Sequence, residues 1–93
     1  MLLKYIIILK LEKLRLSKNQ IQKIQGIAKL QSLTSLDLEG NRITELDGIE
    51  NLSKLIEIDI RNNYIEKIDY LESLSNLKRI RKRGNPMNNN IKR

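Results

Sequence analysis

The sequence predicts an α/β solenoid, a single domain in which short parallel strands stack side by side. A 22-residue pattern keeps strict register along the chain. Apolar and polar residues also alternate within each repeat, as they do in a strand with one buried face. The 93 residues are too few for two ordinary domains, and the register leaves no room for a linker before residue 84. The register is marked by Leu11, Leu33, Leu55 and Leu77 and by Asn19, Asn41, Asn63 and Asn85.

Each repeat opens with the same pattern of residues. Residues 11–24 follow Leu-x-x-Leu-x-Leu-x-x-Asn-x-Ile-x-x-Ile, and the pattern returns at 33–46 and 55–68. It resembles the leucine-rich repeat in its short 22-residue subtype, the type carried by the leucine-rich regulatory subunits of protein phosphatase one. The resemblance implies a right-handed leucine-rich repeat superhelix with a parallel concave sheet and short helical or 3-10 turns on the convex side.

The domain boundaries follow from this register. The whole chain, 1–93, is expected to be one leucine-rich repeat domain, with full repeats at 11–32, 33–54 and 55–76, a degenerate last repeat with an abbreviated cap at 77–87, and a tail at 88–93. Residues 5–10 align with the end of a preceding unit and predict a partial N-terminal repeat. Its apolar residues Ile6, Ile7 and Leu9 form either a cap over the first repeat or an exposed patch that binds another chain.

The elements within each repeat are expected to be short. Period-two alternation predicts strand cores at 13–17, 35–39, 57–61 and, more weakly, 79–83. Since 22 residues leave no room for a long helix, single helical turns are predicted near 27–31, 49–53 and 71–75. Lys82 takes a position that is apolar in the preceding repeats, so the last strand is expected to fray or to turn its end to solvent.

The composition gives little support to an enzyme. The chain has no His and no Cys, which excludes disulfides, thiolate zinc sites and cysteine nucleophiles. No cofactor or metal site is predicted. Asp37 and Asp59 align on neighbouring strands, but an open surface screens both charges, so a solvated acidic strip is favoured over a catalytic pair. Secreted leucine-rich repeat proteins usually close their ends with disulfides, so an intracellular location, cytoplasmic or nuclear, is expected.

The net charge of +7 is concentrated at the C-terminal end. From residue 78 onward there are seven basic residues and no acid, while residues 1–77 hold 11 of each sign. The basic segment 78–83 is a candidate nuclear-localisation or phosphate-binding segment. It has no interleaved aromatic residue for base stacking, so nucleic-acid binding is the minor alternative. The apolar N-terminal stretch is too short to span a membrane.

The strand residues that point away from the core form the candidate partner-binding surface. Acidic residues gather on its two middle strands and basic residues at both ends, a pattern that suits a protein partner with a basic element at its centre. Part of the pattern also fits simple neighbour pairing, with Glu57 beside Arg79 and Asp59 beside Arg81. The candidate residues are Lys13, Arg15, Ser35, Asp37, Glu39, Glu57, Asp59, Arg61, Arg79, Arg81 and Arg83.

The sequence therefore predicts a non-catalytic scaffold that binds another protein through its concave face. The resemblance names a phosphatase catalytic subunit as partner, and the alternative is a nuclear ribonucleoprotein adaptor that uses the basic segment. Self-association through the sheet edges is a further possibility. The four repeat asparagines are predicted to be structural, with their amides bonding the backbone of neighbouring turns. Tyr64 and Tyr70 are expected to be packing residues of the turns and convex side.

Overall fold

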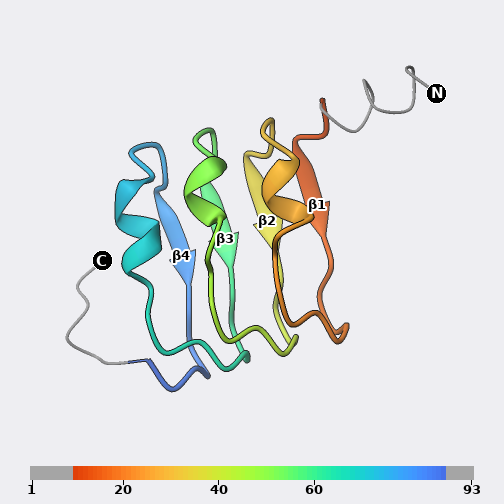
Figure 1. Cartoon of the computed structure of the whole chain (residues 1–93), viewed down its shortest axis with the longest axis vertical. Helices are drawn as coiled ribbons and strands as arrows, with labels where there is room; N and C mark the ends of the chain where they lie inside the picture. The colour runs from red at the N-terminus through yellow and green to blue at the C-terminus, as the bar shows by residue number, and fades with distance from the viewer. Residues whose placement is uncertain (1–9, 88–93) are drawn as a thin grey trace.

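Four parallel strands form one sheet in the computed structural model, which describes residues 10–87. Apart from Lys10, the predicted N-terminal unit and the tail lie outside the described residues. The strands follow chain order and the 3-10 helices cover one face of the sheet, so the predicted fold class is confirmed (Figure 1). The elements are β1 (Lys13–Arg15), η1 (Ile27–Lys29), β2 (Ser35–Asp37), η2 (Ile49–Asn51), β3 (Glu57–Asp59), η3 (Asp69–Ser73) and β4 (Arg79–Arg81).

Neighbouring strands are paired with an offset of 22 residues throughout, so Ser35 lies beside Glu57 and Glu57 beside Arg79. Each strand is two residues shorter than predicted, but the hydrogen bonding continues past its end. Leu16 N donates to the Asp37 carbonyl over 2.8 Å, and Lys18 N donates to the Glu39 carbonyl over 2.7 Å. The ladder therefore spans the predicted strand length.

The expected fraying of the last strand is wrong. Ile60 N donates to the Arg81 carbonyl over 2.8 Å and Asn62 N to the Arg83 carbonyl over 2.9 Å, so the ladder is intact on both sides of Lys82. Lys82 itself is half-buried. A lysine can pack its aliphatic stem while its amino group stays in water, so a charge at this position does not force the backbone out of the sheet.

The core is a single stack of leucine and isoleucine side chains. The two middle turns are sealed, with Leu38 and Ile60 both 0% exposed, whereas Leu14 at one end and Ile80 at the other are only half-buried. This gradient follows from solenoid geometry, because each turn packs only against its neighbours. Among the most deeply buried side chains are Ile24, Leu33, Leu36, Leu38, Ile43, Leu46, Ile49, Leu52, Leu55, Ile58, Ile60, Ile65, Ile68, Leu71 and Leu74.

The repeat asparagines bridge successive turns. Asn63 Nδ2 donates to the carbonyls of Leu38 at 2.9 Å and Ile60 at 3.1 Å, and its Oδ1 accepts from Ile43 N at 3.0 Å. Asn41 and Asn85 make the equivalent bonds one turn before and one turn after. Each amide thus satisfies backbone groups of two turns that the strand ladder leaves unpaired.

The turns on the helical face differ in detail from the prediction. The third helical turn, η3, starts two residues earlier than expected and is five residues long. Tyr70, which lies in η3, packs against the core as expected. Tyr64 is 59% exposed, so its predicted packing role is wrong. It follows the buried Asn63 in a turn that points its side chain to solvent.

Candidate functional site

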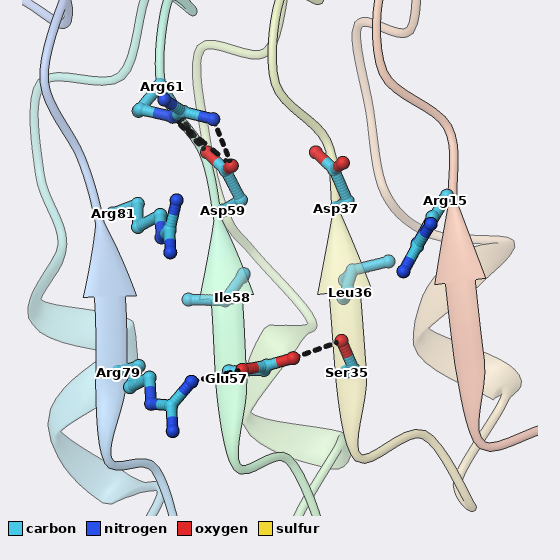
Figure 2. A pocket seen from close by; sticks show the side chains of 10 residues that line it. All are labelled: Arg15, Ser35, Leu36, Asp37, Glu57, Ile58, Asp59, Arg61, Arg79 and Arg81. Atoms are coloured by element: carbon cyan, nitrogen blue, oxygen red, sulfur yellow. Dashed lines mark hydrogen bonds and ion pairs between the residues drawn. The ribbon is translucent and has the colours of Figure 1, made fainter.

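The open face is the surface of the sheet opposite the 3-10 helices, and it carries a shallow hollow over all four strands (Figure 2). Of the predicted binding residues, Lys13, Glu39 and Arg83 lie outside the lining of this hollow. Leu36 and Ile58 also contribute to its lining, and both are buried core residues, as their alternation with polar residues predicts. The predicted residues in the lining are Arg15, Ser35, Asp37, Glu57, Asp59, Arg61, Arg79 and Arg81.

Asp59 and Arg61 form a bidentate ion pair at the rim of the hollow (Figure 2). Arg61 Nη2 lies 2.7 Å from Asp59 Oδ2 and Arg61 Nε lies 2.9 Å from Oδ1, which also accepts from the Arg61 backbone N–H. Partial burial raises the pKa of Asp59, but the Arg61 hydrogen bonds and the charges of Arg61 and Arg81 outweigh it, so the pKa lies below the ordinary value. Asp59 is therefore an ionised anchor for Arg61.

Glu57 holds the other end of the hollow together across three strands. Its Oε1 accepts from Ser35 Oγ on β2 at 2.8 Å, and its Oε2 lies 3.4 Å from Arg79 Nη1 on β4. The predicted pairing of Glu57 with Arg79 is therefore present. The predicted pairing of Asp59 with Arg81 is not, because Asp59 bonds Arg61 instead. No sequence pattern marked that choice.

The charges left without a partner are mainly positive. Glu57 and Asp59 are paired, Asp37 accepts from Glu39 N, and Glu39 accepts from Asn62 Nδ2. Within residues 10–87, the side chains of Arg15, Arg81 and Arg83 make no hydrogen bond or ion pair. Two of the four central acids, Glu57 and Asp59, are thus neutralised by arginines within the protein, as neighbour pairing would suggest, whereas Asp37 and Glu39 accept from uncharged donors.

The arrangement has little means for chemistry. The sequence offers no His or Cys, and Asp59 has a lowered pKa, whereas a general acid needs a raised one. Between residues 10 and 87, no group of three or more acidic side chains is placed to hold a metal ion. In that same part of the chain, no helix is long and apolar enough to cross a membrane.

Comparison with known proteins identifies the repeats. Residues 10–53 match the family model for leucine-rich repeats in two copies. Among curated proteins, no significant match was found. Among solved structures, an internalin (inlF) from Listeria monocytogenes is 33% identical with a TM-score of 0.78 over 83% of this chain. An internalin C2 (inlC2) from the same organism is 34% identical with a TM-score of 0.78 over 85%.

A third similar structure is the functional domain of InlJ from Listeria monocytogenes, which includes a cysteine ladder. It is 31% identical with a TM-score of 0.68 over 76% of this chain. The chain spans only 23%, 35% and 15% of these three proteins, respectively. The match at residues 10–53, the 22-residue register and these structural neighbours together show that this chain is built of leucine-rich repeats and has the leucine-rich repeat solenoid fold.

Proposed function

We propose that this protein is a non-catalytic scaffold that holds a partner protein on its open face. The leucine-rich repeat fold is commonly a protein–protein interaction scaffold. The observation that carries the proposal is the hollow on the open face, which gathers charged side chains from all four strands. Several of these side chains already hold one another in place, so they lose less conformational entropy when a partner docks.

The contacts offered to the partner are charged and polar. Arginine is among the residues that most often dominate binding energy, and Arg61 is held rigidly by Asp59. No aromatic side chain lines the hollow. Binding through such a surface depends on electrostatic complementarity, so we expect its association rate to fall as salt is added.

We propose the catalytic subunit of a phosphatase as the partner, on the resemblance of the repeats alone. Titration of purified phosphatase-one catalytic subunit into this protein tests it directly. Saturable binding that is lost when the open face is altered supports this partner. If no binding is observed, the phosphatase is excluded as the partner. The scaffold proposal is then tested by the experiment below.

A pair of matched variants tests the open face. The open-face variant replaces four acids of the candidate surface, and the control variant replaces four exposed acids elsewhere, so both lose the same charge. The open-face variant carries Asp37→Ser, Glu39→Ser, Glu57→Ser and Asp59→Ser. The control variant carries Glu45→Ser, Asp47→Ser, Glu50→Ser and Glu66→Ser.

Capture from a cell extract, followed by mass spectrometry, then compares the two variants with the unaltered protein. The proposal expects a protein that the control variant retains and the open-face variant loses, with circular dichroism confirming that both are folded. Equal capture by both variants would refute the open face as the binding surface. Filter binding covers the ribonucleoprotein alternative, which predicts strong RNA affinity that collapses between low and moderate salt.

A further inference from the structure

The outer edge of β4 carries backbone N–H groups in a regular position that have no partner among residues 10–87. In each earlier turn, the two N–H groups that follow the strand donate to the next turn, as Ile60 N and Asn62 N do to Arg81 and Arg83. The groups one repeat later are the N–H groups of Lys82 and Gly84. Neither donates to a backbone carbonyl among residues 10–87. This edge therefore has the geometry to accept one more strand.

The same edge is strongly basic. Arg79 and Arg81 project from the open face of β4, and Arg83 follows two residues further along the chain. Arg81, Lys82 and Arg83 also line a second hollow with Arg61 and Ile80. The last acid in the sequence is Glu72. Whatever pairs with this edge must offset several positive charges packed into one turn.

The pairing of β3 with β4 shows which side chains can do so. Glu57 and Asp59 lie at alternate positions of β3, in register with Arg79 and Arg81. At this spacing Glu57 reaches Arg79, and the charge of Arg81 lowers the pKa of Asp59. A strand on the other side of β4 would lie about 4.8 Å away, at the same separation from the same arginines. Acidic residues at its alternate positions would repeat the pairing.

We propose that the β4 edge accepts an extended acidic segment of a partner protein as a fifth strand. The carbonyls of that segment accept hydrogen bonds from the N–H groups of Lys82 and Gly84. Its alternate carboxylates lie beside Arg79, Arg81 and Arg83. The inference rests on the proposed binding role but places a second contact at the sheet edge, which shares Arg79 and Arg81 with the hollow of the open face and adds the backbone of Lys82 and Gly84.

Charge disfavours the other occupants of this edge. A second copy stacked head to tail would set Lys13 and Arg15 of β1 against Arg79 and Arg81 of β4, so that like charges oppose each other. Two copies joined through their β4 edges would repel in the same way. The sequence from 88 to 93 contains two bases and no acid, so it supplies no acidic side chain to pair with these arginines.

Three labelled peptides test the proposal by fluorescence anisotropy. The first alternates Glu with Val and Thr, the second has Lys in place of each Glu, and the third keeps the Glu residues but has Pro between them. We expect binding of the first peptide only. The Lys peptide lacks the negative charge, and each Pro fixes φ at about −65°, away from the regular extended geometry of a paired strand. Equal binding of the Pro peptide would overturn strand addition, and no binding of the Glu peptide would overturn the site.

Variants and a labelled chain locate the contact. Arg81→Ala with Arg83→Ala should weaken the Glu peptide at least tenfold, whereas Arg42→Ala with Lys67→Ala, which removes two exposed bases elsewhere, should leave binding unchanged. In NMR spectra the amide signals of Lys82 and Gly84 should shift on binding. Shifts confined to the open-face hollow would contradict the edge site.

Three other outcomes would assign the β4 edge to a different occupant or exclude it as a binding site. A single-stranded RNA that displaces the Glu peptide and binds more tightly would replace the acidic strand with nucleic acid. Sedimentation that shows stable dimers blocked by the same peptide would assign the edge to a second copy. If peptide binding fails while partner capture still depends on the open face, the edge site falls and the proposed scaffold function stands.

Discussion

Replacing Asn63 by Ala should remove a large part of the free energy of unfolding. The Asn63 side chain is 4% exposed, and it bonds backbone groups of Leu38, Ile60 and Ile43, which are themselves sealed from solvent. Alanine leaves the Ile43 N–H without its partner. It also removes one of two side-chain bonds at each carbonyl, since Leu38 O also accepts from Asn41 Nδ2 and Ile60 O from Asn85 Nδ2. A chain of this length has a net stability of roughly 5–15 kcal/mol, so the loss is large on that scale.

The magnitude follows from the bonds that are lost. The unpaired Ile43 N–H costs about 1–3 kcal/mol, and each bond lost at a carbonyl that keeps another partner costs about 0.5–1.5 kcal/mol, so the total is roughly 2–6 kcal/mol. A water molecule that enters the vacated space restores part of the bonding, so we expect about 2–4 kcal/mol. Asn63→Asp keeps the acceptor for Ile43 N but sets an oxygen against the carbonyls, so it should cost at least as much as alanine.

Asn19 provides the matched control. It holds the same repeat position, but it is exposed, and within residues 10–87 its side chain bonds only the carbonyls of Leu16 and Ser17 in its own turn. Water can replace those bonds, so Asn19→Ala should cost less than about 1 kcal/mol. Urea unfolding followed by circular dichroism measures both variants. If Asn63→Ala and Asn19→Ala differ by less than about 0.5 kcal/mol, the argument from burial is wrong.

Three further predictions rest on single positions. Gly26→Ala should raise the free energy of unfolding by about 0.5–1 kcal/mol, since φ is −66° and an added Cβ meets no atom within 4 Å. Gly48→Ala, at the same repeat position but with φ of 100°, should lower the free energy of unfolding by about 1–2 kcal/mol. Urea midpoints that shift in the same direction in both variants would contradict this contrast. NMR titration should place the pKa of Asp59 below 3.8, so the stability from its pair with Arg61 is present above that pH and is lost as pH falls through the folded pKa. Arg61→Gln should return the Asp59 pKa toward its ordinary value, and an unchanged pKa would argue against the pairing. Lys82→Leu should raise the free energy of unfolding by about 1 kcal/mol, because it fills a position that is apolar in the preceding turns, and a lower urea midpoint would count against it.

Most of the fold could be predicted because each repeat restates the same local pattern. Leu36 and Ile58 alternate with polar residues and occupy equivalent places in successive repeats, and the structure pairs them in register. The prediction failed where a single side chain was taken to decide the backbone. Lys82 was expected to make the last strand fray or turn its end to solvent, but the ladder beside it depends on backbone groups that every residue except proline supplies.

The sequence by itself determined the 22-residue coil, the strands that stack and the side chains that face away from the core, because period and burial are properties of the chain pattern. Only the tertiary structure decided how the exposed charges pair. Asp59 lies beside Arg81 of β4 and two residues before Arg61. Its carboxylate accepts hydrogen bonds from both the backbone and the side chain of Arg61. Among residues 10–87, this choice of partner leaves Arg81 without a hydrogen-bond or ion-pair partner at the sheet edge. The choice depends on distances of a few ångströms, which no repeat pattern encodes.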